Sequence, residues 1–252
     1  MPIAPLVYVV VAFAFVAEAI TGFGGTVITV TLGGQLLPLD QLLPLYVPVN
    51  FVLSASLAWR DRQHIARAFL TRKMLPLVAC GMVVGLAIYR VAPPGPLLLL
   101  GYGALVAILA TVELLRGPPQ PDQGARRGMT QILGLLGGGV IHGIYGSGGP
   151  LVVWAASREL AEKSVLRSTL AVLWLALGAV LMVQYASLGQ MTVQTLLASA
   201  TLLPVLAAAL WIGHRLHARV APALFRKLVY SLLLGGALSL VIRHGLKLLH
   251  AS

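Results

Sequence analysis

The sequence predicts an all-α polytopic membrane protein made of two inverted-topology repeats, and three observations lead to this prediction. Hydrophobic residues make up 58% of the 252 residues and charged residues only 10%, whereas soluble domains are about 25% charged. Long apolar runs recur along the chain, and the second half repeats the glycine pattern of the first. So few charges cannot cover a water-facing surface, which excludes a soluble globular enzyme. The composition also excludes a disordered or fibrous protein.

Six uninterrupted apolar segments are predicted to be transmembrane helices. Each approaches the about 20 residues that a helix needs to cross about 30 Å of hydrocarbon. Helices are expected because lipid cannot satisfy free backbone groups, and the sequence lacks the short alternating segments of a β-barrel. The six predicted spans are residues 41–59, 74–91, 97–115, 168–187, 193–213 and 224–242.

Two further apolar segments, residues 4–34 and 131–157, are interrupted by glycine clusters. Glu18-Ala-Ile-Thr-Gly-Phe-Gly-Gly25 in the first aligns with His142-Gly-Ile-Tyr-Gly-Ser-Gly-Gly149 in the second. Each half of the chain is therefore predicted to contain one broken segment, which could be re-entrant, followed by three transmembrane helices.

The two repeats are predicted at residues 1–115 and 129–252, with a cytoplasmic linker at 116–128 that is rich in Pro, Gly, Gln and Arg. Ala17-Glu18-Ala19 matches a signal-peptide cleavage site only weakly, and apolar sequence continues beyond it. We therefore expect the N-terminal segment to belong to the membrane domain.

The positions of the basic residues predict that the two halves are inverted. Loop 60–73 is strongly basic, whereas its counterpart at about 188–201 carries no charge. In the second half the basic loop is 214–227, whereas its counterpart at 90–96 carries only Arg90. Because cytoplasmic loops of membrane proteins are enriched in Lys and Arg, equivalent loops are predicted to lie on opposite sides. The net charge of +11 is thus attributed to membrane orientation rather than to nucleic-acid binding.

This topology requires segment 131–157 to enter and leave on the cytoplasmic side, and segment 4–34 to do the same from outside. Two arms of about 12 residues, each about 18 Å long, would bring each turn to the middle of the bilayer. The arrangement leaves Arg243 and Lys247 outside. The alternative, eight plain spans, places loop 214–227 on the wrong side of the membrane.

The glycine breaks are the predicted substrate site. A break exposes backbone N–H groups at the start of the next helix, where an anion can bind, and paired broken segments in inverted halves are typical of transporter sites. Pro150 favours a helix start there, and Thr26 holds the matching place. The alternative role of the glycines is close helix packing. The predicted substrate-binding residues are Gly22, Gly24, Gly25, Thr26, Asn50, Tyr145, Gly146, Ser147, Gly148 and Gly149.

Glu18 and His142 hold equivalent positions next to the two breaks. An ionised group at the bilayer centre costs at least about 2.5 kcal/mol, so such residues are often functional. A carboxyl and an imidazole can also exchange protons, which makes both residues candidates for proton coupling. Structural hydrogen bonding is the alternative role for both.

Motifs for catalysis or cofactor binding do not occur. Tyr145-Gly-Ser147-Gly-Gly149 lacks the first glycine of a nucleophile elbow, and no phosphate-binding loop follows Gly22-Phe-Gly-Gly25. No cluster has metal-ligand spacing, and the single cysteine, Cys80, cannot form an internal disulfide. We therefore expect no enzyme activity, no cofactor and no metal.

The two Gly-x-Gly-Gly breaks, Gly22–Gly25 and Gly146–Gly149, are each followed by a long apolar helix. Together with the basic stretch Arg60–Lys73 and the small size, they resemble the TauE/SafE sulfite exporter family over essentially the whole chain. The first half departs from the usual pattern, because Thr26 stands where a glycine or proline is common and residues 38–48 are rich in proline. The resemblance implies a permease for small sulfur-containing anions such as sulfite and organosulfonates.

The predicted function is a secondary transporter of a small anion, a sulfur-containing oxyanion or organosulfonate, that works by alternating access with proton coupling through Glu18, His142 or both. The alternatives are an anion channel-like pore and an intramembrane enzyme, for which only Ser147 and His142 could act as nucleophile and base. The predicted location is the inner, or plasma, membrane. The predicted partners are the anion and the bilayer, and a homodimer is compatible with the sequence.

Overall fold

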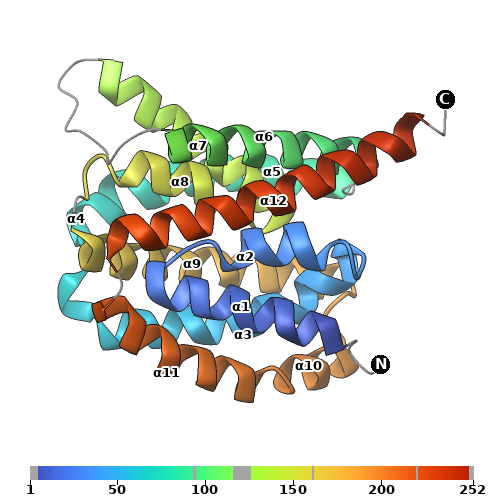
Figure 1. Cartoon of the computed structure of the whole chain (residues 1–252), viewed down its shortest axis with the longest axis horizontal. Helices are drawn as coiled ribbons and strands as arrows, with labels where there is room; N and C mark the ends of the chain where they lie inside the picture. The colour runs from blue at the N-terminus through green and yellow to red at the C-terminus, as the bar shows by residue number, and fades with distance from the viewer. Residues whose placement is uncertain (1–4, 93–94, 116–125, 161, 220, 250–252) are drawn as a thin grey trace.

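The computed structural model describes residues 5–92, 95–115, 126–160, 162–219 and 221–249 (Figure 1). Within these ranges all regular elements are helical. Short turns of 3₁₀ helix at Arg62–His64 and of π-helix at Thr29–Gly33 and Leu70–Met74 adjoin the α-helices. The α-helices are α1 (Pro5–Thr21), α2 (Gly25–Ile28), α3 (Leu39–Arg60), α4 (Arg67–Phe69), α5 (Leu75–Val91), α6 (Pro96–Leu115), α7 (Arg126–Tyr145), α8 (Gly149–Ala156), α9 (Lys163–Ser187), α10 (Val193–Ala200), α11 (Leu203–Arg219) and α12 (Pro222–Leu249).

Five of the six predicted spans correspond to single helices, α3, α5, α6, α9 and α12. The prediction of one helix over 193–213 is wrong, because the chain forms α10 and α11 with a bend of 41° between them. Pro204 explains the interruption, since a proline has no N–H and its ring clashes with the carbonyl four residues earlier. By length and apolar composition, four described helices could cross a membrane, or five if α10 and α11 count as one bent span.

Both predicted broken segments are broken at the glycines, but their arms are unequal. The first arm is α1, with 17 residues and a length of about 26 Å, and the return arm consists of four residues of α2 and five of π-helix. In the second segment α7 has 20 residues and α8 only eight. The expected arms of about 12 residues are therefore wrong. In each broken segment the glycines lie beyond the midpoint. Helix α7 starts inside the predicted linker, and residues 116–125 of that linker lie outside the described ranges.

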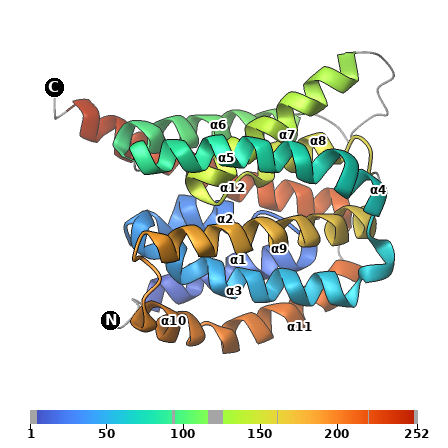
Figure 2. The same ribbon diagram turned by 180° about the vertical axis from the view of Figure 1, so that it is seen from behind.

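The packing of the bundle interleaves the two halves of the sequence. The most extensive helix contacts are those of α3 with α9, α6 with α12, α1 with α11 and α5 with α7 (Figures 1 and 2). Each of these pairs takes one helix from residues 5–115 and one from residues 126–249. The broken segments fold back, so that α2 packs along α1 and α8 along α7.

Small residues allow the backbones of α5 and α7 to approach closely. A Cβ at Gly85 would lie 2.9 Å from the Cα of Gly143, and one at Gly143 would lie 2.7 Å from the backbone nitrogen of Leu86. Gly81 and Gly139, one turn earlier on each helix, face the partner backbone in the same way. This is the small-xxx-small packing that is common between membrane helices, where lipid provides no hydrophobic driving force.

One end of the bundle, named the basic end, holds the described residues of loops 60–73, 158–167 and 214–227, which are predicted to be cytoplasmic. Three contacts tie these loops together: Lys73 Nζ to Glu159 Oε2 at 3.0 Å, Lys163 Nζ to the His217 carbonyl at 2.7 Å, and the ion pair of Arg167 with Asp61. The second broken segment begins and ends here, since Gln131 Nε2 donates to both the Ala155 carbonyl and the Glu159 carboxylate.

The opposite end, named the distal end, holds the start of α1 and the end of α12 (Figure 1). Its contacts join Tyr8 to Thr201 at 2.7 Å, Gln190 to Tyr89 at 3.5 Å, and Arg243 Nη1 to the Gln35 carbonyl at 2.7 Å. The first broken segment therefore begins and ends at the distal end, and each broken segment returns to the end of the bundle from which it starts.

Arg167 joins three helices at the basic end. Its Nη1 donates to the Ala19 carbonyl at the end of α1 at 2.9 Å, and its Nη2 pairs with Asp61 at the end of α3. Both side chains are largely buried, with exposed fractions of 5% for Arg167 and 18% for Asp61. Removal of one partner leaves a buried charge without compensation, which is strongly destabilising.

We expect Arg167→Gln to lower the free energy of unfolding by about 3 kcal/mol, because it leaves Asp61 unpaired. The measurement is reversible unfolding in mixed micelles. Arg72→Gln is the control, since it removes the same charge from an exposed residue at the same end and is expected to change stability by less than about 0.5 kcal/mol. Equal losses in the two variants would contradict the structural role of the buried pair.

Candidate functional site

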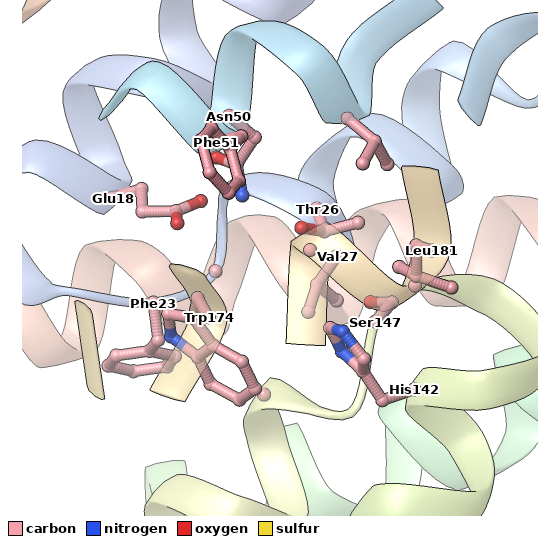
Figure 3. Close-up of a pocket in the computed structure, with 15 residues that line it drawn as sticks. Glu18, Phe23, Thr26, Val27, Asn50, Phe51, His142, Ser147, Trp174 and Leu181 are labelled. Atoms are coloured by element: carbon pink, nitrogen blue, oxygen red, sulfur yellow. The ribbon is translucent and has the colours of Figure 1, made fainter. Parts of the chain in front are cut away.

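A cavity lies where the two helix breaks meet near the centre of the bundle (Figure 3). Its volume is about 30 Å³. Side chains reach it from α1, α2, α3, α7 and α9, so both halves of the sequence contribute. The lining residues are Glu18, Phe23, Gly24, Thr26, Val27, Val47, Asn50, Phe51, His142, Gly146, Ser147, Gly149, Trp174, Gly178 and Leu181.

The first break depends on glycines in a left-handed conformation. Gly22 and Gly24 have φ values of 80° and 91°, which residues with a Cβ rarely adopt. The Thr21 hydroxyl lies 2.7 Å from the Ala17 carbonyl and 2.8 Å from the Phe23 carbonyl, so it bridges the turn. The indole N–H of Trp174 donates to the Gly22 carbonyl at 2.8 Å. The bonds to the Gly22 and Phe23 carbonyls satisfy groups that the helix break leaves without helical partners.

The second break uses a different set of bonds. Gly146 has a φ of 63°, and its N–H donates to the His142 carbonyl at 2.7 Å. The next helix, α8, begins at Gly149, with Pro150 in its first turn as the sequence predicts. The Gly148 N–H donates to Nδ1 of His142 at 3.4 Å. The imidazole therefore closes its own break, whereas the first break is closed by Trp174 of another helix.

Glu18 is a buried hydrogen-bonded carboxylate with an exposed fraction of 2%. The Tyr46 hydroxyl donates to its Oε2 at 3.4 Å. In the amide orientation that satisfies the hydrogen bonds, Asn50 Nδ2 lies 3.2 Å from Oε1 and 3.1 Å from Oε2. Within the described residues no basic side chain forms an ion pair with Glu18. The carboxyl is thus held in place by neutral donors and carries no compensating charge.

His142 directs a free ring nitrogen into the cavity. Its exposed fraction is 5%, and in the described part of the chain its Nε2 has no hydrogen-bond partner. Because Nδ1 accepts from Gly148, the proton of the neutral ring resides on Nε2. The ring stacks on Trp174 at a centroid distance of 5.3 Å and an interplanar angle of 20°. Figure 3 shows the ring extending from α7 toward Thr26 and Val27. His142 is therefore an oriented N–H donor.

Eight of the twelve residues predicted for the site and for proton coupling line this cavity. They are Glu18, Gly24, Thr26, Asn50, His142, Gly146, Ser147 and Gly149. The hydroxyl of Ser147 is bonded to Tyr102 at 2.6 Å. The break residues of one half thus lie beside those of the other half, although they are more than 100 positions apart in the sequence.

The remaining four predicted residues do not line the cavity, and each has a structural role. A Cβ at Gly22 would lie 2.8 Å from the Cα of Arg167. A Cβ at Gly25 would overlap the Glu18 carboxylate, and a Cβ at Gly148 would overlap the backbone of α7. The Tyr145 hydroxyl donates to the Leu98 carbonyl at 2.6 Å, outside the cavity. Close packing, the alternative role considered for the glycines, therefore accounts for Gly22, Gly25 and Gly148.

Seven lining residues were missed by sequence reasoning: Phe23, Val27, Val47, Phe51, Trp174, Gly178 and Leu181. Most are apolar side chains that resemble any lipid-facing residue. Trp174 had a usable signal, since the alignment that places Glu18 opposite His142 also places Asn50 opposite Trp174. Extending the alignment of the two halves into the long helix after each break would have identified Trp174 as a candidate.

The cavity lining combines hydrogen-bond donors with one carboxyl group. The His142 N–H, the Thr26 side chain and the start of α8 at Gly149 all face the cavity, and a helix start carries partial positive charge. The Glu18 carboxylate supplies the opposite chemistry, a group that can take up a proton. Among the described residues no group of three or more His, Cys, Asp or Glu side chains could hold a metal ion.

Comparison with known proteins gave two matches. The family model described as "Sulfite exporter TauE/SafE" matches residues 7–240. The "Probable sulfite/organosulfonate exporter TauE" of Cupriavidus necator is 27% identical over 230 residues, which cover 89% of this chain and 88% of that protein. No solved structure matches the chain.

We expect Gly25→Ala to destabilise the protein, because its Cβ would lie 2.6 Å from the Tyr46 hydroxyl and closer still to the Glu18 carboxylate. Overpacking of this kind costs about 1–3 kcal/mol. The control is Gly235→Ala, since nothing lies within 4 Å of its Cβ and alanine is the better helix former by about 1 kcal/mol. Unfolding in mixed micelles measures both variants. A Gly25→Ala protein as stable as Gly235→Ala would show that the contact is not restrictive.

Proposed function

Since the chain belongs to the TauE/SafE sulfite exporter family, we propose that it is a secondary transporter of a small sulfur-containing oxyanion or organosulfonate that works by alternating access. The observation that carries the proposal is the central cavity, where the breaks of both halves meet around the unpartnered Nε2 of His142. The related exporter of Cupriavidus necator, described as acting on sulfite and organosulfonates, supports the substrate class.

The sulfite dianion and ionised sulfonate groups present several acceptor oxygens and no hydrogen-bond donor. A cavity with a fixed imidazole N–H and a helix start at Gly149 offers donors at the places where such oxygens would lie. The ring of Trp174 and the side chains of Phe51 and Leu181 complete the lining. Apolar walls strengthen the few hydrogen bonds that the anion makes, because the local dielectric constant is low.

The proposed inverted relation of the halves is supported by the pattern of helix pairs. If α1, α3, α5 and α6 correspond in order to α7, α9, α10–α11 and α12, the pair α1–α11 corresponds to the pair α7–α5. The pairs α3–α9 and α6–α12 then each join a helix to its own counterpart. Such pairing is expected for two repeats related by a two-fold axis. The broken segments, which start from opposite ends, would place that axis in the membrane plane.

Proton coupling is proposed through Glu18. An ionised Glu18 would repel an anion in the same cavity, and no ion pair within the described residues compensates its charge. A proton on the carboxyl would remove this repulsion, so proton and anion would favour each other's binding. His142 can assist by donating from Nε2, and it could also carry the proton itself.

The basic end is proposed to face the cytoplasm of an inner, or plasma, membrane. Besides the basic loops, this end carries three Trp–Arg pairs, Trp59 with Arg62, Trp154 with Arg158 and Trp211 with Arg215, at 5.1, 4.0 and 3.8 Å from the ring centroid. Tryptophan is enriched at membrane interfaces, and Arg and Lys are enriched on the cytoplasmic side.

The two other functions considered have less support. An intramembrane protease or esterase needs a nucleophile bonded to its base, whereas Ser147 is bonded to Tyr102, and Nδ1 of His142 accepts from Gly148. A channel-like pore needs no proton-binding group in its path. Saturable, gradient-driven flux separates a carrier from a channel.

For substrate binding we expect His142→Phe to raise the KM for radiolabelled sulfite in proteoliposomes by about tenfold, the loss of one hydrogen bond to a charged group. Phenylalanine keeps a ring against Trp174 but removes the donor. Thermal unfolding verifies that the variant is folded, and Glu162→Gln, at the exposed residue that precedes α9, is the control. An unchanged KM in folded His142→Phe would remove His142 from the proposed site.

For coupling we expect sulfite flux through the wild-type protein to be accelerated by a proton gradient directed with the anion. In Glu18→Gln the flux should be the same with and without the gradient, because the amide cannot exchange a proton. Flux measured at several pH values, with and without an imposed gradient, provides the test. Gradient stimulation that persists in Glu18→Gln would exclude this carboxyl as the proton carrier, and its persistence in His142→Gln as well would exclude coupling through either residue.

A further inference from the structure

Arg90 and Arg243 lie at the distal end, against the charge asymmetry of the rest of the chain. Both line one large cavity there, with a volume of about 610 Å³. We name it the distal vestibule. Its polar and charged lining residues used below are Asp40, Tyr89, Arg90, Gln190, Arg243 and His244.

The cations at the two ends differ in how their charge is used. At the basic end Lys73 and Arg167 form ion pairs, and Arg215 lies over an aromatic ring. At the distal end, among the described residues, Arg243 donates only to the Gln35 carbonyl, and neither it nor Arg90 forms an ion pair. A guanidinium has five N–H donors, so most donors of these two side chains are available to a ligand.

Buried polar groups of the distal vestibule also lack full hydrogen bonding. Tyr89 is 4% exposed, and its hydroxyl accepts from Gln190 Nε2 at 3.5 Å. The hydroxyl proton then has no acceptor among the described residues, and Gln190 Oε1 is buried without a partner. If the amide is reversed, the hydroxyl donates to Gln190 and the NH₂ becomes the free donor. In either orientation a buried donor remains for a ligand.

His244 and Asp40 complete the electrostatic environment. His244 is 6% exposed, and its Nδ1 donates to the Leu240 carbonyl at 3.0 Å, so Nε2 is the nitrogen left for the vestibule. Asp40, in the first turn of α3, is exposed and is the acidic residue in the lining. Two arginines against one aspartate leave an excess of positive charge, which raises the local concentration of anions.

We propose that the distal vestibule is a second anion-binding site, which takes the same sulfur oxyanion or sulfonate at the end of the bundle opposite the basic loops. The identity of the anion rests on the proposed function, but the presence of the site does not. Arg90 and Arg243 bind the anion, and Tyr89 with Gln190 supplies a donor at the buried side.

A thiol reporter tests the electrostatics of the distal vestibule without any transport. Leu188 lines it and is 41% exposed, so Leu188→Cys in a Cys80→Ala background places one thiol there. The probes are methanethiosulfonate reagents with either an ethylsulfonate or an ethyltrimethylammonium group. We expect the ratio of anionic to cationic reaction rates to fall about tenfold in Arg90→Gln/Arg243→Gln.

Inorganic sulfate should slow the anionic reagent more than sodium chloride does at equal ionic strength, since screening alone is then the same. Arg72→Gln at the basic end is the charge-matched control and should leave the rate ratio unchanged. Arg90→Gln alone, which breaks no hydrogen bond or ion pair described above, should give part of the effect even if the double variant folds poorly. An unchanged ratio in both variants, or an equal fall in Arg72→Gln, would overturn the proposal.

Sided transport connects the distal vestibule to function. With sulfite supplied from the distal side of oriented proteoliposomes, Arg90→Gln/Arg243→Gln should raise KM about fivefold, and with sulfite supplied from the basic side it should leave KM unchanged. An equal rise from both sides would indicate a general structural defect and would overturn the proposed role. Absence of sulfite flux in the wild-type protein would instead refute the proposed function. The thiol reaction rates would then test by themselves whether the distal vestibule binds anions.

Discussion

The bundle depends on one constraint, that backbone groups released by a helix break within a membrane must find partners in the protein. At the end of α1 the carbonyls of Ala19, Ile20 and Gly22 accept from Arg167, His217 and Trp174. These three donors belong to α9 and α11, in the second half of the chain. The first half alone therefore does not satisfy all the carbonyl groups of its break. The interleaved pairs α1–α11 and α3–α9 follow from this dependence, because they bring the donors to the carbonyls.

The two breaks solve the same problem with different residues, and this difference gives the cavity its chemistry. In the first break an external indole binds the Gly22 carbonyl, which leaves Glu18 free to be held by Tyr46 and Asn50. In the second break His142 accepts from the Gly148 N–H, which sets its tautomer and directs Nε2–H into the cavity. Two sequence-related segments thus place a proton acceptor and an N–H donor around one space. A symmetrical pair of breaks would have supplied only one of these groups.

Sequence patterns predicted the elements that depend on local composition. Apolar length identified the helices, glycine clusters located both breaks, and Glu18 and His142, which the sequence predicts to be equivalent, line the same cavity. The arm lengths and the bend before Pro204 were not predicted, because an apolar run does not show where its helix stops. The roles of Gly25 and Gly148 were also inaccessible, since a glycine required by a neighbouring backbone has the same pattern as one that faces a ligand. Only the packing of Tyr46 and of α7 against them separates the two cases.

For the basic residues, too, the residue type alone does not determine the role, because the role depends on the neighbouring groups. The sign and loop position of the basic residues predict orientation, and on that measure Arg90 and Arg243 are exceptions. The contacts of each basic side chain provide a second criterion. Cations such as Arg167 and Lys73 are bound by acidic side chains that hold loops together, so their charge stabilises the fold and attracts little else. Arg90 and Arg243 keep their charge available in a space large enough for an anion. Arg90 and Arg243, which form no ion pair within the described residues and line a cavity, are therefore better explained by the proposed anion than by membrane orientation.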